Sequence, residues 1–535
     1  MYRTYINNST VNRNIVLPDV VAPNTVYGSG CGVGQTDLSI SAQQSTEHPS
    51  DEAQAIRLLG YKYCLMTDRE IKYPHKDPFY GIDLLISNFK AFSQHRFLET
   101  VTKRHDEVGE TYQLNMLGTV AKTNIINTGI MTRDHEIIKT VLSTRFKDYN
   151  LQEERKKALH PLMGAGIFSS DGAAWAHSRA LLRPQFARKQ LMDLSMLETH
   201  VKRLMDVIVD GKEIELQELV LRFTMDMATD FLLGESTNSL LQEQHDYHSK
   251  LKGFKDSIQY AQDRIATHIA LGGLAILKPD PKFQQHVNVV HKFVDGLVHD
   301  ALRGNSSDSK ALPYVLLRAI IEDTQDPIQI RNEILNILVA GRDTTAGLIA
   351  NVFLMLSIRP ELWSMLRNEV AQFQNQPPTF DNISDCRYIR YTINESLRLY
   401  PPVPVNSRVA ICDTVLPRGG GLEGKSPLFI PKGTPVVYNV FGLHRKQEVY
   451  GADAEEFNPS RWKSLRLSWE FLPFNGGPRI CIGQQFAIME ASYVLIRFLQ
   501  EFETIESRDS RPWQENIALT TSSLNGVRVS LKRLG

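Results

Sequence analysis

Cys481, near the C-terminus, stands in a sequence that could make it a metal ligand. It lies in the run Phe474-Asn-Gly-Gly-Pro-Arg-Ile-Cys-Ile-Gly483, and a helical pattern begins at Gln484. The first turn of a helix offers unpaired N–H groups and the positive end of the helix dipole, and both favour a thiolate over a thiol. The two central glycines permit a tight turn, and Gly483 leaves room for a flat cofactor above the helix start. Arg479 is placed to pair with an anionic group.

An acid and a hydroxyl interrupt a long apolar helical pattern further upstream, in the run Ala340-Gly-Arg-Asp-Thr-Thr345. Gly341 sits in mid-helix, where glycine costs about 1 kcal/mol relative to alanine. A purely structural interpretation exists for Thr344, because a threonine hydroxyl can bond to the preceding turn and bend a helix. Asp343 and Thr344 are otherwise unexpected in an apolar run.

Two further pairs of residues share helix faces. Glu395 and Arg398 are three positions apart, and Trp175 and Arg179 are four apart. Pairs at these spacings are neighbours on one face and contribute about 0.2–0.5 kcal/mol on an exposed helix. The Leu-Tyr-Pro-Pro sequence that follows Arg398 stops its helix.

These motifs, in this order, resemble those of the cytochromes P-450. The pattern Phe474-x-x-Gly477-x-Arg479-x-Cys481-x-Gly483 matches the haem-binding loop of that family at every defined position. The resemblance implies that Cys481 is the axial thiolate ligand of haem b, a ligand that favours O–O cleavage. It also implies that Phe474, Arg479 and Gly483 belong to the cofactor-binding loop.

The resemblance implies roles for the other residues as well. Asp343 and Thr344 correspond to the pair that organises proton delivery on the oxygen-binding side of the haem. Trp175 and Arg179 correspond to residues that reach a haem propionate, and Arg408 corresponds to a further propionate-binding arginine.

Glu395 and Arg398 acquire a third partner through the same resemblance. In the family, such a pair meets an arginine from a downstream segment, here Arg461 in Phe457-Asn-Pro-Ser-Arg-Trp. The three form a buried network beneath the haem and are structural residues. Buried charges persist only when they are paired, so breaking this network should cost several kcal/mol.

Composition and charge limit the fold. The 535 residues are 42% hydrophobic and 22% charged, which excludes a disordered or collagenous chain. Equal numbers of basic and acidic residues argue against a nucleic-acid partner, and five widely spaced cysteines argue against a disulfide framework. Length alone suggests about three or four domains. The resemblance instead implies one, a mainly α cytochrome P-450 domain with small β-sheets over residues 61–535, preceded by a polar, disordered segment over 1–60.

Mostly helices are expected to position the motifs. Apolar periodicity predicts helices over 83–98, 175–209, 216–233, 287–302, 328–367 and 486–502, and β-branched stretches predict strands over 119–130, 435–440 and 526–531. Strands near both ends of a helical body favour one α-rich domain over a chain of modules.

The implied reaction inserts one oxygen atom from O2 into a C–H bond with two electrons. The sequence contains no flavin- or nicotinamide-binding pattern, so a separate NADPH–cytochrome P-450 reductase is the expected donor. The stretches 76–83, 177–186, 416–421 and 472–481 look like the fungal alkane and fatty-acid ω-hydroxylase branch, which implies a long-chain alkane or fatty acid as the hydrophobic substrate. Residues 334–339, apart from Asn336, and 403–405 are expected to line its pocket.

Three alternatives stay open at this point. Related branches also oxidise polyketides and other fungal secondary metabolites. A haem-thiolate isomerase would need no reductase. A haem sensor or carrier would need neither Asp343 nor Thr344, so the presence of both residues argues against it.

The sequence also bears on location. No stretch reaches the roughly 18 consecutive apolar residues that span a bilayer, and the N-terminus lacks the apolar core of a signal peptide. We therefore expect an intracellular protein at the cytosolic face of the endoplasmic reticulum, without a transmembrane segment in this chain. Members of the branch usually carry an N-terminal membrane helix, and none is visible here. Three explanations stay open: the chain is truncated, it is differently spliced, or it binds the membrane only peripherally through apolar surface near residues 79–98.

Overall fold

The computed structural model describes most of the chain beyond residue 70. The described ranges are 71–76, 81–117, 126–186, 192–234, 236–241, 247–271, 279–304, 315–421 and 423–535. The segment over 1–60 that we predicted to be disordered lies outside them, as does most of the predicted strand at 119–130. The described residues are mainly helical with small sheets, which confirms the predicted fold class.

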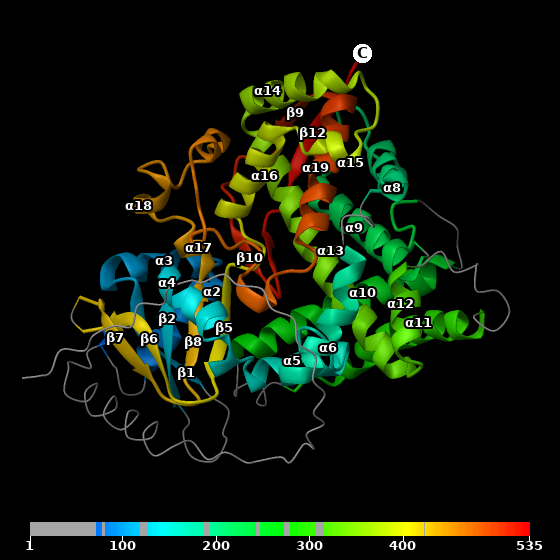
Figure 1. Cartoon of the computed structure of the whole chain (residues 1–535). Helices are drawn as coiled ribbons and strands as arrows, with labels where there is room; N and C mark the ends of the chain where they lie inside the picture. The colour runs from blue at the N-terminus through cyan, green and yellow to red at the C-terminus, as the bar shows by residue number, and fades with distance from the viewer. Residues whose placement is uncertain are drawn as a thin grey trace, which may run out of the picture. The chain divides into compact units, whose positions relative to one another are not determined.

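Helices make up most of the domain (Figure 1). They are α2 (Ile82–Ser93), α3 (Phe97–Val108), α4 (His135–Lys139), α5 (Glu153–Met163), α6 (Gly172–Leu182), α8 (Ser195–Asp206), α9 (Leu216–Leu233), α10 (Tyr247–Leu271), α11 (Pro281–Gly304), α12 (Val315–Asp323), α13 (Pro327–Ser357), α14 (Pro360–Val370), α15 (Phe380–Ile383), α16 (Arg387–Leu399), α17 (Val440–Leu443), α18 (Gln447–Tyr450) and α19 (Gln484–Glu501).

The strands form small sheets, of which the largest has five strands. Its order is β1 (Thr111–Leu117), β2 (Ile126–Thr132), β8 (Pro435–Asn439), β5 (Val405–Ala410) and β3 (Tyr149–Asn150). Neighbouring strands are antiparallel except β2 and β8, which are parallel. The smaller sheets are β4 (Glu213–Glu215) with β12 (Arg528–Arg533) and β9 (Phe502–Ser507), β6 (Thr414–Gly420) with β7 (Ser426–Ile430), and β10 (Glu515–Ile517) with β11 (Thr521–Ser523). Figure 1 shows the five-stranded sheet to one side of the long helices.

Helix α13 is the central element of the helical part. It begins with Pro327 in its first turn, directly after Asp326, whose carboxylate accepts a hydrogen bond from the Ile328 N–H at 2.9 Å. Proline at this position and aspartate as the N-cap are favourable starts for a helix. By length and composition alone α13 could cross a membrane, but 78% of its most apolar 18-residue window is buried inside the protein. Such burial is typical of a core helix.

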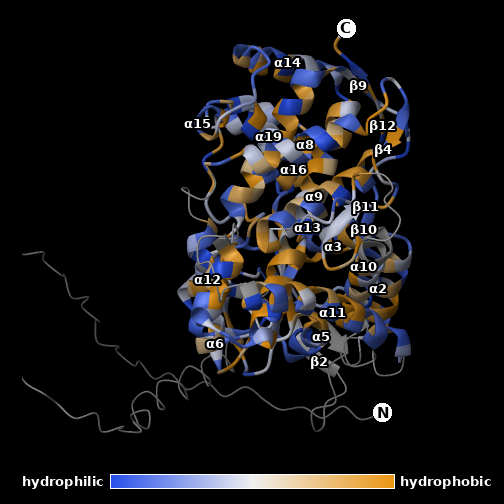
Figure 2. Cartoon of the chain, turned by 90° about the vertical axis from the view of Figure 1, so that its right-hand side faces the viewer, coloured by the Kyte–Doolittle hydropathy of each residue, from blue (hydrophilic) through white to orange (hydrophobic). Residues whose placement is uncertain are grey.

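Two apolar clusters meet along α13. The N-terminal half, from Ile330 to Val339, packs with apolar side chains of α5, α10, α11 and α12. The C-terminal half, from Ala346 to Leu356, packs with α9, α14, α16 and α19. Figure 2 shows hydrophobic residues in orange alternating with hydrophilic residues in blue along these helices. The polar stretch 340–345 lies between the two clusters.

Several predicted helix boundaries hold, and others are wrong. The helix predicted over 216–233 is α9, and that predicted over 486–502 is α19 with a two-residue shift at its start. The run 328–367 is two helices, because α13 ends at Ser357 and α14 restarts at Pro360. The runs 83–98 and 175–209 are likewise interrupted, after α2 and after α6.

Candidate active site

The loop before α19 is held by two glycines that no other residue could replace without movement. Gly477 has a φ of 68°, and a Cβ there would collide with the carbonyl oxygen of Leu142. A Cβ on Gly476 would lie 2.6 Å from the Trp469 ring. The expected tight turn with close backbone approach is therefore confirmed. The turn brings the Cys481 N–H to the Phe474 carbonyl oxygen at 3.0 Å.

Cys481 combines exposure with close packing. Its side chain is exposed, yet burial among protein atoms raises the pKa of its thiol. A hydrogen bond from the Gly483 backbone and the charge of Arg179 oppose that rise in pKa. The backbone at the helix start therefore favours the thiolate as expected, but burial outweighs it and the pKa of the thiol rises overall. A bound metal would favour the thiolate despite burial, because a thiol that coordinates a metal loses its proton outright.

Gly483 is not required by neighbouring protein atoms. A Cβ at this position would meet only ordinary contacts, at 3.7 Å from the Phe186 ring and 3.9 Å from the Cys481 sulfur. It would project beside the sulfur. The glycine therefore fits a requirement set by a flat group next to the thiol.

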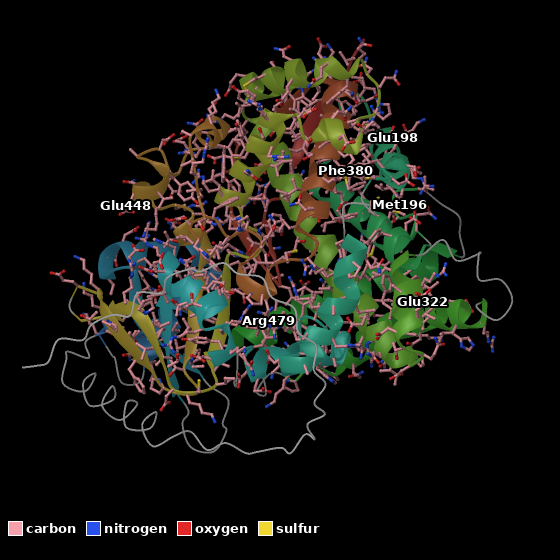
Figure 3. All side chains as sticks on the ribbon, in the orientation of Figure 1. Met196, Glu198, Glu322, Phe380, Glu448 and Arg479 are labelled. Atoms are coloured by element: carbon pink, nitrogen blue, oxygen red, sulfur yellow. The ribbon has the colours of Figure 1, made fainter. Side chains whose placement is uncertain are left out.

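A cluster of arginines lies near the loop. Arg479, labelled near the centre of Figure 3, donates to Asp171 at 2.7 Å and to the Ser170 carbonyl at 3.0 Å. Burial and the charges of three further arginines lower the pKa of Arg479 to about 10, although Asp171 opposes this effect. The three are Arg408, Arg155 and Arg179. Positive charge is therefore in excess among these residues.

Arg155, on α5, is a member of this cluster that our sequence analysis missed. It donates to the Asn406 side-chain oxygen at 2.8 Å, and Arg408 Nη1 lies 3.5 Å from the same oxygen. Burial, with the neighbouring charge of Arg408, lowers the pKa of Arg155 to about 10. The Nε of Arg408 is buried without a hydrogen-bond partner within the described part of the chain. No motif spacing marks Arg155, so sequence patterns offered no means of finding it.

Trp175 and Arg179 lie against the cysteine loop, as their predicted role at the same haem requires. The Arg479 guanidinium lies 4.5 Å from the centre of the Trp175 ring, and Arg179 lies 5.9 Å from it. Arg179 also donates to the carbonyl oxygen of Ile480, the residue before Cys481, at 2.9 Å. Cation–π contacts of this kind hold guanidinium groups in place.

The polar stretch of α13 opens onto space. Ala340, Gly341, Asp343 and Thr344 are partly exposed although the helix on either side of them is almost wholly buried. A Cβ on Gly341 would meet no atom within 4 Å. Ile482, in the cysteine loop, packs against the apolar cluster that includes the preceding turns of α13.

The side chains of Asp343 and Thr344 are both engaged. The Thr344 hydroxyl donates to the Ala340 carbonyl at 2.7 Å, which is the back-bonding that the structural interpretation requires. Asp343 forms an ion pair with Arg342 at 3.2 Å and accepts a hydrogen bond from Gln262 of α10 at 2.6 Å. The geometry of Thr344 is therefore compatible with both interpretations, since its hydroxyl oxygen keeps an acceptor position.

The prediction that residues 334–339 line the pocket is wrong. Ile334, Leu335 and Leu338 are 0% exposed and pack within the apolar core. Asn336 is also fully buried, where it bonds the Phe168 N–H and the Met163 carbonyl. Periodicity could not separate a core face from a pocket face on a helix that is apolar all round.

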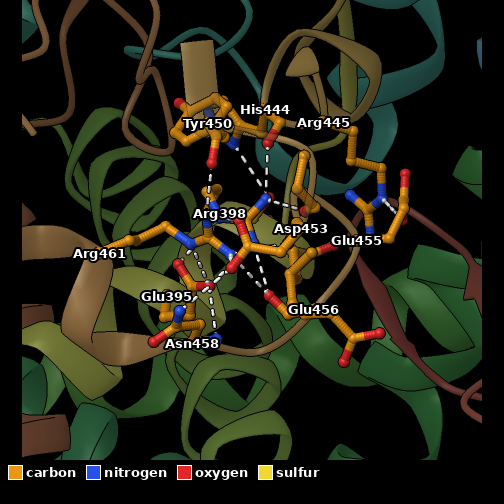
Figure 4. Close-up of polar contacts among 12 residues, drawn as sticks. Glu395, Arg398, His444, Arg445, Tyr450, Asp453, Glu455, Glu456, Asn458 and Arg461 are labelled. Atoms are coloured by element: carbon orange, nitrogen blue, oxygen red, sulfur yellow. Dashed lines mark hydrogen bonds and ion pairs between the residues drawn. The ribbon is translucent and has the colours of Figure 1, made fainter. Parts of the chain in front are cut away.

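The three-residue network around Glu395 is confirmed (Figure 4). Arg398 reaches both oxygens of Glu395, at 2.9 and 2.8 Å, and Arg461 reaches one oxygen at 2.9 Å. Trp462 and the Asn458 N–H complete five hydrogen bonds to this carboxylate. Glu395 and Arg398 are 0% exposed, so their charges are compensated inside the protein.

His444 also belongs to this network. Its Nε2 accepts the Leu472 N–H at 2.8 Å, and its Nδ1 lies 3.2 Å from the Arg398 carbonyl oxygen. Within the described ranges, no group of three or more His, Cys, Asp or Glu residues is placed to hold a metal ion.

A haem would provide binding partners for both the Cys481 thiol and the arginine cluster. Its iron would accept the Cys481 sulfur, and its two propionates would neutralise the excess charge of the arginine cluster. An exposed cysteine ahead of a long helix, beside an arginine cluster in a mainly helical protein, is the arrangement expected of a haem-thiolate enzyme.

Comparison with known proteins agrees with this class. Residues 78–527 match the family model described as Cytochrome P450. The chain is 46% identical over 471 residues to cytochrome P450 monooxygenase himC of Aspergillus japonicus, covering 86% of this chain and 83% of that protein. It is 41% identical to cytochrome P450 monooxygenase fsdH of Fusarium heterosporum, covering 86% and 82%, and 43% identical to cytochrome P450 52A5 of Candida maltosa, covering 75% and 80%. The chain belongs to the cytochrome P450 family, and it is a monooxygenase that uses haem b.

Proposed function

We propose that this cytochrome P450 hydroxylates a C–H bond of a long-chain alkane or fatty acid, with Cys481 as the axial ligand of its haem. The observation that carries the cofactor assignment is the arginine cluster beside the exposed Cys481 thiol: Arg479 pairs with Asp171, and the charges of Arg408, Arg155 and Arg179 all act on Arg479. Eukaryotic cytochromes P450 generally act on hydrophobic substrates with O2 and a reductase. We infer that NADPH–cytochrome P450 reductase is the electron donor here.

Cofactor binding would engage the loop and the arginine cluster together. The Cys481 sulfur would ligate the iron, with Phe474 and Gly483 shaping the loop around it. Arg155, Arg179, Arg408 and Arg479 would hold the propionates, and the Trp175 ring would keep two of these guanidinium groups in place. The haem, once bound, supplies the activation of O2.

Asp343 and Thr344 would manage the protons of the reaction. The Asp343 carboxylate would carry a proton into the cavity that this part of α13 borders. The Thr344 hydroxyl donates to Ala340 and can accept a hydrogen bond at the same oxygen, so it can hold a proton donor in place. General acid–base assistance of this kind contributes about 10²–10⁴-fold to a rate.

The proposed substrate class rests on a sequence resemblance and on the apolar character of two residues. Four stretches of the sequence resemble the fungal alkane and fatty-acid ω-hydroxylase branch, and the half-buried Val403 and Val405 are apolar. The alternative substrates, polyketides and other secondary metabolites, belong in the same assay. Shift of the haem Soret band on addition of alkanes, fatty acids and polyketides would identify the class that binds. Preferential binding of polyketides would overturn the lipid assignment.

The axial ligand is tested by Cys481→Ala. The reduced, CO-bound protein should lose the red-shifted Soret band that thiolate ligation produces, whereas Cys412→Ala should keep it. Survival of that band in Cys481→Ala would show that another residue binds the iron. Turnover with and without NADPH and reductase then separates a monooxygenase from a haem-thiolate isomerase.

Peripheral contact with the endoplasmic reticulum is the last part of the proposal. One face of α2 exposes Ile82, Ile86 and Phe89, at 56%, 63% and 71% of their surface, and Phe92 continues it. An exposed apolar helix face can lie at a bilayer surface. Replacing Ile86 and Phe89 by serine should move the expressed protein from the membrane fraction to the soluble fraction on sedimentation at neutral pH, and an unchanged distribution would contradict this contact.

A further inference from the structure

Asp343 is held by a side chain from another helix. Gln262, on α10, donates through its amide nitrogen to Asp343 Oδ2 at 2.6 Å. Its amide oxygen accepts from Arg342 Nη1 at 3.2 Å, and the same guanidinium nitrogen forms the ion pair with Asp343 Oδ1 at 3.2 Å. Gln262, Arg342 and Asp343 thus close a ring of polar contacts between α10 and α13.

The ring lies in a setting that fixes its geometry. Gln262 is 1% exposed and Arg342 is 2% exposed. The neighbours of Gln262 on α10, Ala261 and Ile265, are 0% exposed and belong to the apolar core. Polar contacts in such surroundings are strong when they are satisfied and costly when they are broken. The amide of Gln262 can take only one orientation, because its oxygen faces a guanidinium and its nitrogen faces a carboxylate.

The two oxygens of Asp343 have different surroundings. Oδ2 accepts the short hydrogen bond from Gln262, whereas Oδ1 is buried and accepts no hydrogen bond from the described residues. Oδ1 is held only through the charge of Arg342. The carboxylate is therefore anchored at one oxygen and keeps the other available.

We propose that Gln262 is a positioning residue for proton delivery, which holds the Asp343 carboxylate beside Thr344 and ties its orientation to the position of α10. The inference rests on the proposed role of Asp343. It predicts that a shift of α10 against α13 changes the orientation of the acid without any change in α13 itself.

Gln259 provides a matched control within the same helix. Its amide oxygen also accepts from Arg342 Nη1 at 3.2 Å, but its amide nitrogen donates to Asp263 at 3.1 Å. The two glutamines therefore share the arginine and differ in the carboxylate that they hold. Gln262→Leu and Gln259→Leu remove similar contacts to Arg342, and the first alone removes the hydrogen bond to Asp343.

The decisive measurement is product formed per NADPH consumed, with peroxide and the solvent isotope effect measured alongside. Gln262→Leu should lower the product yield about tenfold, the effect of losing one hydrogen bond to a charged group. Gln259→Leu should change it little. Haem content and substrate-induced Soret shifts should match the unmodified enzyme in both variants. The stretching band of carbon monoxide on the reduced haem, which senses nearby polar groups, should change only in Gln262→Leu.

A second variant, Gln262→Glu, tests the same role if the leucine substitution disturbs folding. Gln262→Glu retains the acceptor for Arg342 but places a carboxylate against Asp343, so the pair should hold a proton to higher pH. The other charged groups of this network are Arg342 on α13 and Asp263 on α10. The pH midpoint of coupled turnover should move upward in Gln262→Glu and much less in Gln259→Glu.

The outcomes distinguish failure of the Gln262 positioning role from failure of the proposed function of Asp343. Equal yields, isotope effects and carbon monoxide bands in Gln262→Leu and Gln259→Leu would overturn the positioning role. If Asp343→Asn itself left the yield and the isotope effect unchanged, the proposed function of Asp343 would be wrong before Gln262 was considered.

Discussion

Replacing Glu395 with alanine tests how far one buried carboxylate organises the fold. Its two oxygens accept five hydrogen bonds, two from Arg398 and one each from Arg461, Trp462 and the Asn458 backbone. Arg398 is 0% exposed, so Glu395→Ala would leave a buried guanidinium with carbonyl acceptors but no anion. Removing one partner of a buried pair costs about 3–5 kcal/mol. Domains are stable by only about 5–15 kcal/mol, so the loss should be large.

Urea denaturation of the holoenzyme, followed by circular dichroism at a fixed haem concentration, measures this loss. A matched control is Glu423→Ala, because the Glu423–Lys425 pair is 77% and 82% exposed and should leave the midpoint unchanged. Glu395→Gln keeps the side-chain volume but turns an NH2 group toward hydrogen-bond donors. Its urea midpoint should therefore lie between those of Glu395→Ala and Glu423→Ala. A decrease below about 1 kcal/mol in Glu395→Ala would refute the argument that this network is compensated only from within.

Three further predictions follow from the site. Gly477→Ala should abolish stable haem incorporation, measured by the Soret absorbance per protein, because the added Cβ would collide with the Leu142 carbonyl at a φ of 68°. Burial lowers the pKa of His444 to about 3, so the unfolded chain takes up a proton below about pH 6.5 that the fold excludes. Stability should therefore fall as pH drops from about 6.5 to 3, and His444→Asn should flatten that slope in pH-dependent unfolding. Thr344→Ala should keep haem content and substrate binding but release peroxide while NADPH is consumed; full coupling would mean that the hydroxyl serves helix geometry alone.

Local sequence signals account for much of the fold. The helix α9 is predicted to its last residue, and Gly234, with a φ of 63°, supplies the stop that follows it. The break between α13 and α14 was also visible in principle, since Pro360 disfavours a helical conformation at Arg359. Helix α10 was missed, because its apolar residues are interspersed with many polar ones and its burial depends on packing against α11.

Motif spacing predicted the site residues on the cysteine loop, on α6 and on α13, and the structure places their side chains in ways that fit those assignments. It could not predict Arg155 or Gln262, because their contacts lie at least 80 positions away in the sequence. Arg342 shows most clearly what motif spacing cannot predict. Within the run Ala340-Gly-Arg-Asp-Thr-Thr345, the arginine has no role that spacing reveals, yet its guanidinium meets Gln259, Gln262 and Asp343. The motif predicts candidates for the chemistry, whereas the tertiary fold decides which side chains contact them; for Asp343, α10 supplies one such contact through Gln262.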